Sequence, residues 1–327
     1  MKKNAIINII LFFLLVSCGK NYPKNEVINF ISHENAGNDY VKKRLSEEKF
    51  DVCQYFSGNS EKYIKYNDRY IVLDTATKGF EYTAEIYEVN KDFEKNKIYN
   101  IKMGKGPNEG MDLDSIVKIK NKYYIYDRNL CRFLIYDKNF EYIETYYLYK
   151  EIGVSTFFKH NNKYYAIGST EDKITIYEVN FEKKVHLKEK GVFEYSSRKD
   201  NFTNMRRESQ IVKNGKGLLI IRSGNIVTYF SKDNSFKKIR EIYLGVGSIK
   251  IGDKEVPSVS VESLLFDTNN NFITKYSKNV YKFYDYKNDD LEEIKTNKNV
   301  VLLFKAWDKI HYVLRKNDNY YLYKNKK

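Results

Sequence analysis

The chain has 327 residues, and its 57 Lys and Arg against 43 Asp and Glu give a formal net charge of +14. This length is enough for one large domain or two ordinary ones. Aromatic residues make up 16% of the chain, with 31 Tyr and only 3 Pro, a composition that favours half-buried β-strands. Lys is spread along the chain in turn sequences and no aromatic-basic recognition module is present, so we expect no nucleic-acid partner.

The N-terminus has the pattern of a bacterial lipoprotein signal. Lys2 and Lys3 precede a short apolar run from Ala5 to Val16, and Ser17-Cys18-Gly19 follows. The run is too short to span a bilayer comfortably, which favours a signal peptide over a transmembrane helix. We therefore predict a signal peptide over residues 1–17, cleavage before Cys18 and lipid on the Cys18 thiol. An ordinary secretory signal followed by an incidental cysteine is the alternative.

The residues after Cys18 bear on the compartment. Gly19 gives no Asp-type signal for retention in the inner membrane, so we expect an anchor in the outer membrane. Residues 19–22 lack an acidic run, which favours the periplasmic side over the cell surface. Residues 18–48 are polar and mixed, and we expect a tether there, with a short helix within Asn38 to Glu48.

From residue 49 to residue 327 the chain repeats one pattern: short aromatic-rich strands separated by Asn, Asp or Gly turns. The first turn of each unit recurs at intervals of 39 to 55 residues, at Asn67, Asn121, Asn161, Asn214, Asn269 and Asp308. Antiparallel strands with such turns, in units of about 40 to 50 residues, are typical of propeller blades. The sequence therefore predicts an all-β fold, a six-bladed β-propeller of four-stranded antiparallel blades.

The sixth unit ends at Tyr323 and lacks room for its outermost strand. The alternating segment from Phe50 to Phe56 is the segment that we expect to supply this strand from the N-terminal side. Such an exchange joins the first and last blades and removes a free sheet edge.

The loop Gly104-Lys105-Gly106-Pro107-Asn108-Glu109 is followed by strand ends Ile125-Tyr126-Asp127 and Ile135-Tyr136-Asp137. The chain thus resembles the six-bladed, TolB-like propeller lipoproteins of Bacteroidetes, which share a Gly-x-Gly-Pro-x-Glu loop. It is more loosely similar to NHL-type propellers. Position 110 is Gly where the family often has an aromatic residue, and the later blades have drifted. The resemblance implies fold and compartment far more than activity.

Two groups of loop residues are candidates for binding a ligand or partner. Lys105, Asn108 and Glu109 lie in the Gly-rich loop, which we interpret first as a turn between blades, because a phosphate-binding loop needs a helix after it. Arg206 and Arg207 lie in an insertion at about residues 193–209, and a second insertion covers residues 245–261. Long loops on a rigid scaffold commonly carry recognition.

Catalytic and metal-binding patterns are absent from the sequence. The four His residues have no metal-ligand spacing, and there is no Gly-x-Ser-x-Gly motif. We expect no metal and no cofactor, and we interpret Asp112 and Asp114 as solvated turn residues. Cys53 and Cys131 are expected to be free thiols rather than a disulfide.

These observations favour a non-enzymatic module, lipid-anchored in the envelope, that binds or scaffolds a protein, peptide or glycan. A propeller lyase or hydrolase acting on envelope glycan or peptide is the first alternative, and it requires carboxylate, His or metal ligands that converge at the centre of the ring. A structural subunit of an envelope transport or secretion assembly is the second.

Overall fold

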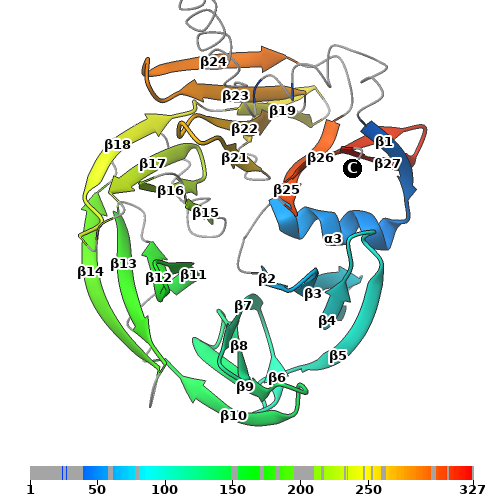
Figure 1. Ribbon diagram of the computed structural model, residues 1–327, viewed down its shortest axis with the longest axis vertical. Helices are drawn as coiled ribbons and strands as arrows, with labels where there is room; N and C mark the ends of the chain where they lie inside the picture. The colour runs from blue at the N-terminus through cyan, green and yellow to red at the C-terminus, as the bar shows by residue number, and fades with distance from the viewer. Residues whose placement is uncertain are drawn as a thin grey trace, which may run out of the picture.

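The computed structural model describes most of the chain from residue 40 onward. The described residues are 24, 27, 40–57, 62–78, 81–148, 154–169, 173–181, 185–194, 210–214, 217–231, 233, 235–245, 247–251, 253–258, 263–277, 279–295, 300–307 and 309–325. They form six antiparallel blades around one axis (Figure 1). The expected all-β, six-bladed propeller with four-stranded blades is confirmed.

Blades 1 to 3 follow one another along the chain, and each runs from its innermost to its outermost strand. Blade 1 contains β2 (Tyr63–Tyr66), β3 (Arg69–Lys78), β4 (Glu81–Val89) and β5 (Lys95–Met103), with the short parallel strand β6 (Glu109–Gly110) beside β5. Blade 2 contains β7 (Leu113–Ile119), β8 (Lys122–Asp127), β9 (Arg132–Asp137) and β10 (Tyr142–Tyr147). Blade 3 contains β11 (Val154–His160), β12 (Lys163–Ser169), β13 (Lys173–Asn180) and β14 (His186–Glu194).

Blades 4 to 6 complete the ring. Blade 4 contains β15 (Gln210–Asn214), β16 (Leu218–Ser223), β17 (Ile226–Ser231) and β18 (Lys238–Tyr243). The insertion before blade 5 forms a hairpin of β19 (Gly247–Ile251) and β20 (Lys254–Ser258). Blade 5 contains β21 (Leu264–Phe266), β22 (Phe272–Ser277), β23 (Val280–Asp285) and β24 (Asp290–Lys295). Blade 6 contains β25 (Val300–Ala306), β26 (Lys309–Lys316) and β27 (Asn319–Asn325).

The outermost strand of blade 6 does come from the N-terminal side, but the predicted segment is wrong. Strand β1 (Tyr40–Leu45) pairs antiparallel with β27, with Tyr40 opposite Asn325 and Leu45 opposite Tyr320. The expected strand Phe50–Phe56 lies instead in helix α3 (Glu47–Ser57), and no helix forms over residues 40–45.

Helix α3 begins where its sequence provides a cap. The Ser46 hydroxyl accepts a hydrogen bond from the Lys49 N–H, and Glu47 and Glu48 occupy the first turn, where the helix dipole favours acidic residues. Phe50, Cys53 and Phe56 follow at intervals of three and pack between blades 6 and 1. This spacing buries one face of a helix, and it explains why an apparent strand pattern became helical.

Each pair of neighbouring blades is joined by its own cluster of buried apolar side chains. In three of these clusters a Phe from the turn between the third and fourth strands of a blade packs against the preceding blade. These residues are Phe93, Phe140 and Phe236, with φ of 61°, 62° and 47° and exposures of 0%, 3% and 0%. A positive φ is unfavourable for Phe, so burial of the ring offsets backbone strain at these turns.

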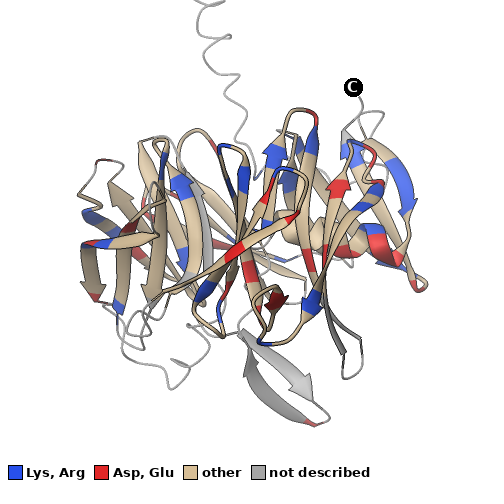
Figure 2. Cartoon of the chain, turned by 90° about the horizontal axis from the view of Figure 1, so that it is seen from below, with Lys and Arg blue, Asp and Glu red and all other residues tan. Residues whose placement is uncertain are grey.

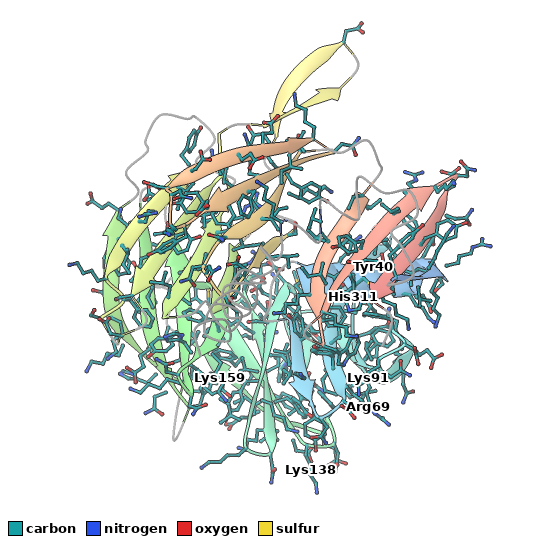
Figure 3. All side chains as sticks on the ribbon, turned by 45° about the horizontal axis from the view of Figure 1, so that its top comes forward. Tyr40, Arg69, Lys91, Lys138, Lys159 and His311 are labelled. Atoms are coloured by element: carbon teal, nitrogen blue, oxygen red, sulfur yellow. The ribbon has the colours of Figure 1, made fainter. Side chains whose placement is uncertain are left out.

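Because the strands of every blade alternate in direction, the loops divide between two faces of the ring. We call the terminal face the one that carries Tyr40, Asn325 and the turns at residues 120–121 and 161–162. The opposite, distal face carries the segment 104–112, the turn 128–131 and the β19–β20 hairpin, which projects from the ring (Figure 3).

Charged side chains are distributed around the whole ring. Figure 2 shows Lys and Arg interleaved with Asp and Glu over the blades, as expected from lysines spread along the chain. Among the described residues, no helix has the length and apolar character needed to cross a membrane.

Candidate functional site

The Gly-rich loop on the distal face is held closed by its own glutamate. The Glu109 carboxylate accepts a hydrogen bond of 2.7 Å from the Gly106 N–H. Gly104 has a φ of +147°, and a Cβ on it would lie 2.1 Å from the Glu109 Oε2 atom. The glycines are therefore required for the close approach of this carboxylate, and Glu109 acts within the loop.

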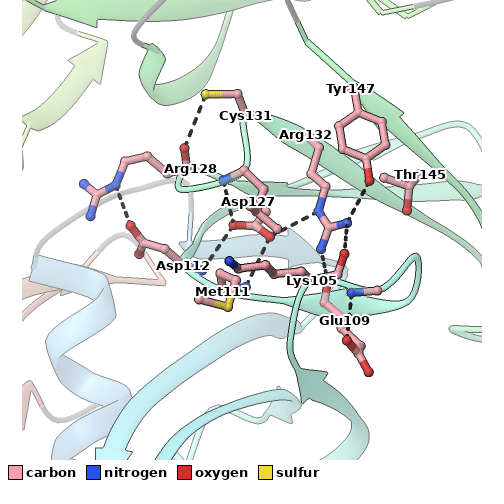
Figure 4. Close-up of polar contacts among 12 residues, drawn as sticks. Lys105, Glu109, Met111, Asp112, Asp127, Arg128, Cys131, Arg132, Thr145 and Tyr147 are labelled. Atoms are coloured by element: carbon pink, nitrogen blue, oxygen red, sulfur yellow. Dashed lines mark hydrogen bonds and ion pairs between the residues drawn. The ribbon is translucent and has the colours of Figure 1, made fainter. Parts of the chain in front are cut away.

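The same loop is also held by the side chain of Arg132, the first residue of β9 (Figure 4). Its guanidinium donates to the carbonyls of Lys105 at 3.1 Å and Glu109 at 2.6 Å, and to the hydroxyl of Tyr147 at 3.2 Å. Arg132 also forms an ion pair of 3.3 Å with Asp127, and both side chains have 0% exposure. A buried ion pair with this many hydrogen bonds fixes the loop to the core of blade 2.

The predicted binding residues of this loop thus have different environments. The Asn108 amide oxygen accepts a hydrogen bond from the Tyr136 hydroxyl at 2.8 Å, which ties that side chain to blade 2. Lys105 is exposed, and only its carbonyl is used in the loop. Arg206, Arg207 and Cys18 lie outside the described residues, so their environments stay predictions.

Directly after the loop, carboxylates and cations from blades 1 and 2 gather at the distal end of β7. We call Lys62, Asp74, Asp112, Asp114 and Arg128 the polar cluster. Asp112 forms an ion pair of 2.8 Å with Arg128, and their side chains are 37% and 29% exposed. Figure 4 shows this pair beside Asp127, whose carboxylate accepts from the Met111 and Asp112 N–H groups. The outer part of the cluster is therefore open to solvent.

Asp114 forms the inner part of the polar cluster. It is 5% exposed, and its Oδ2 atom has no hydrogen-bond partner within the described part of the chain. Burial raises the pKa of Asp114 to about 6, although Lys62 and Arg128 act in the opposite direction. The expectation that Asp112 and Asp114 are both solvated turn residues is therefore wrong for Asp114, because its side chain is buried near the start of β7.

Lys62 lies across the blade interface from Asp114. Its ammonium donates to the Thr75 hydroxyl at 2.9 Å and lies 5.6 Å from the centre of the Tyr55 ring. Burial lowers the pKa of Lys62, and the charges of Asp114 and Asp112 partly offset this effect. The ordering of Lys62 therefore depends on blade 1 and on α3, which provides Tyr55.

Asp74 connects the polar cluster to the middle of blade 1. Its carboxylate accepts a hydrogen bond from the Tyr55 hydroxyl and forms an ion pair of 3.0 Å with Lys95, whose side chain is 10% exposed. Burial and the neighbouring Asp74 charge raise the pKa of Tyr55. The Asp74 carboxylate therefore already has its hydrogen-bond and ion-pair partners. Within the described part of the cluster, the buried acceptor atom without a partner is Oδ2 of Asp114.

The polar cluster can do two kinds of chemistry. An unused buried carboxyl oxygen accepts a hydrogen bond from an ammonium, amide or hydroxyl group of a ligand. A carboxyl group with a pKa near 6 beside a desolvated lysine also has the pattern of a general acid and base pair. No group of three or more His, Cys, Asp or Glu side chains that could hold a metal ion occurs among the described residues.

Sequence reasoning named two of the three aspartates of the cluster, Asp112 and Asp114, as solvated turn residues, and it missed Asp74 and both cations. Lys62 lies 50 residues before Asp112 in the sequence and belongs to another blade, so only the ring brings them together. The signal that points to Lys62 is its position, because it directly precedes the first strand of blade 1, as Asp112 directly precedes the first strand of blade 2. Among the described residues, Cys53 and Cys131 are free thiols.

Comparisons with known proteins give the fold and no activity. No family model matches the chain, and no curated protein matches it. A protein of Bacteroides fragilis assigned as exported is similar in structure, with a TM-score of 0.51, 12% identity, and coverage of 88% of this chain and 95% of that one.

Two further structures are similar at lower identity. A member of the DUF4221 family from Bacteroides vulgatus has a TM-score of 0.50 and 10% identity, and covers 88% of this chain and 96% of its own. The virginiamycin B lyase of Staphylococcus aureus has a TM-score of 0.46 and 9% identity, over 87% of this chain and 98% of the lyase. At these identities, the similarities to the two Bacteroides proteins show the fold alone. The propeller expected from the resemblance to Bacteroidetes proteins is thereby confirmed.

Proposed function

We propose that this chain is a lipid-anchored envelope propeller that binds a protein, peptide or glycan on its distal face. The observation that carries the proposal is the separation of the two faces. Strand β1 begins at Tyr40, on the terminal face, whereas the polar cluster, the fixed loop 104–110 and the β19–β20 hairpin lie on the distal face. An anchor at Cys18 would turn the distal face away from the membrane.

The distal face has the properties of a recognition surface. Its loop is held by Arg132 and Glu109 before any ligand arrives, so little ordering is needed on binding. Lys105 is exposed on that loop, and the pair of Asp112 and Arg128, which begins two residues after the loop, is partly exposed. Rigid loops with a few polar groups around a buried carboxyl group give orientation and specificity to a bound ligand.

The surface is tested by photo-crosslinking in cells. A photoreactive amino acid is placed at Lys105 or at the exposed hairpin residue Asp253 on the distal face, and at exposed Lys138 on the terminal face as the matched control. We expect a discrete adduct from Lys105 and Asp253 and none from Lys138. Adducts from all positions, or from Lys138 alone, would reject the distal face as the binding surface.

The anchor and compartment are tested separately. We expect Cys18→Ala to move the chain from the outer-membrane fraction to the soluble fraction, and the wild type to incorporate labelled palmitate. We also expect the wild type to resist protease added to intact cells, as a periplasmic orientation requires. Retention of the variant in the membrane would show that no lipid on Cys18 holds it.

A second candidate function is an enzyme acting on envelope glycan or peptide. It is favoured by Asp114 and Lys62, because burial raises the pKa of Asp114 and lowers the pKa of Lys62, which brings both values closer to pH 7. If this function holds, turnover of isolated envelope glycan or peptide will show an inflection near pH 6 that Asp114→Asn abolishes. Absence of turnover, with a ligand still cross-linked to the distal face, would reject the enzymatic function and support the binding function.

A further inference from the structure

A pocket of about 660 Å³ lies between blades 2 and 3 on the terminal face, opposite the polar cluster. The turns β7–β8 and β11–β12 and the end of β13 form its walls. Aromatic residues Tyr124, Tyr164 and Phe181 line it, together with Lys120, Lys122 and Lys163. It is therefore a different site from the one proposed above.

An incompletely buried aromatic ring distinguishes this pocket from the corresponding places in blades 1, 2 and 4. In those blades a Phe with positive φ is buried against the preceding blade. In blade 3 the aromatic residue is Phe181, directly after β13, and it remains half-buried without adopting a positive φ. Blade 5 has Tyr286 at the corresponding place, but the Arg240 guanidinium covers that ring at 4.8 Å.

The aromatic side of the pocket is rigid. The Phe181 ring makes edge-to-face contacts with Tyr124 at 4.8 Å and Tyr164 at 5.5 Å between centroids. The Tyr164 hydroxyl donates to the Lys118 carbonyl of blade 2 at 2.8 Å, which fixes this ring across the blade interface. Partly exposed, immobilised aromatic rings give the apolar C–H faces of a sugar a stacking surface at little entropic cost.

The charge of the pocket is positive. Its carboxylate, Glu178, is already paired with Lys163 at 2.8 Å and Lys190 at 2.7 Å, and hydrogen bonds from these lysines lower the pKa of Glu178. Lys120 and Lys122 have no carboxylate partner within the described part of the chain. Two uncompensated ammonium groups beside an aromatic surface match a ligand that combines a sugar ring with an anionic group.

We propose that this pocket binds an acidic saccharide. The sugar ring lies against Phe181 and Tyr164, and the carboxylate or phosphate group is held by Lys120 and Lys122. The anion can be the carboxylate of a uronic acid or the phosphate of a phosphorylated sugar, since both accept hydrogen bonds from lysine.

Isothermal titration calorimetry on the purified full chain tests the site. The probes are a tetrasaccharide of alternating glucuronic acid and N-acetylglucosamine, glucose 6-phosphate, and the uncharged tetramer of N-acetylglucosamine. We expect at least one of the two acidic probes to bind more tightly than the neutral one. We expect Lys120→Gln with Lys122→Gln to weaken its binding about tenfold or more, in line with the energy of charged hydrogen bonds.

The control variant is Lys138→Gln, an exposed lysine at the outer edge of the ring in blade 2 (Figure 3), and its affinity should equal that of the wild type. Phe181→Ala should also weaken binding, with the urea midpoint measured for every variant to confirm folding. Failure of both acidic probes to bind at millimolar concentration would overturn the proposal. Equal binding of the neutral tetramer, or equal weakening by Lys138→Gln, would overturn it too.

Discussion

Arg132 and Asp127 form an ion pair in which both side chains have 0% exposure, with 3.3 Å between Nε and Oδ2. Asp127 also accepts hydrogen bonds from the Met111 and Asp112 N–H groups, while Arg132 donates to two carbonyls of the preceding loop. The pair therefore joins the distal-face segment 104–112 to the core of blade 2. The position of the polar cluster depends on it, because Asp112 and Asp114 follow that segment directly.

Replacing Arg132 should show how much this ion pair contributes to the free energy of unfolding. We expect Arg132→Met to lower the free energy of unfolding by about 3–5 kcal/mol, because it leaves the buried Asp127 charge without its cationic partner. Urea denaturation followed by fluorescence measures the change. The matched control is Arg315→Gln, which removes an exposed pair with Asp318, and we expect an unchanged midpoint. Similar midpoints for both variants would show that the buried pair does not hold the loop.

The contact between Gly104 and Glu109 can be measured with a double-mutant cycle. We expect Gly104→Ala to cost about 1–3 kcal/mol, from its φ of +147° and from the collision of the new Cβ with the Glu109 carboxylate. In a Glu109→Ala background the collision is absent, so the cost of Gly104→Ala should fall by about 0.5 kcal/mol or more. Urea midpoints of the four proteins give the coupling. Strictly additive effects would mean that the carboxylate does not occupy the space beside Gly104.

The blade architecture could be predicted because each blade repeats its own local signals. Turn residues such as Asn67 and Asn161 do adopt positive φ, of 52° and 47°, as an Asn-containing hairpin turn requires. The Asx hydrogen bonds of Asp137 and Asp267, which accept from N–H groups two and four residues later, repeat in the same way. Local chemistry of this kind is visible in the sequence.

The closing strand and the polar cluster are harder to predict from the sequence, because they depend on packing between distant segments. Phe50 to Phe56 alternates well enough for a strand, and only the Ser46 cap and the spacing of Phe50, Cys53 and Phe56 favoured a helix. The polar loop around Asp114 predicts a solvated side chain, but in the folded ring Asp114 is only 5% exposed. Lys62 could not be assigned to it until the ring placed blades 1 and 2 side by side.

His311 should make the fold sensitive to acid. Its ring stacks on Phe304 at 5.1 Å, and burial lowers the pKa of His311 from 6.5 to about 4. The unfolded chain therefore takes up a proton at higher pH than the folded chain, and stability is lost as pH falls from about 6.5 to about 4. The loss amounts to about 3 kcal/mol at 1.36 kcal/mol per pKa unit.

We expect His311→Phe to remove this part of the pH dependence. Urea midpoints at pH 7.5 and pH 4.5 should differ less in the variant than in the wild type. All other titrating groups, including Asp114, are common to both proteins, so the difference between their two changes in urea midpoint isolates His311. Equal changes in midpoint would show that the imidazole is protonated at the same pH in the folded and unfolded chains.

Asp114 should show the opposite dependence on pH. Its pKa is raised from 3.8 to about 6 in the folded chain, so the folded state holds this proton more tightly than the unfolded state. Stability from this group is therefore present below about pH 4 and is lost as pH rises through 6. At pH 8 the ionised carboxylate disfavours the fold by about 1–3 kcal/mol.

Asp114→Asn carries no charge, and we expect it to raise the free energy of unfolding at pH 8 by about 1–3 kcal/mol and to lose this advantage near pH 4. Urea denaturation at the two pH values measures both effects. Asp112→Asn, which removes an exposed partner of Arg128, is the matched control and should give no such gain. Destabilisation by Asp114→Asn at pH 8 would instead identify Asp114 as a structural partner of Lys62. A gain would mean that the chain keeps an ionised carboxyl group at the expense of its own stability, as expected for a residue whose role is to contact a ligand on the distal face.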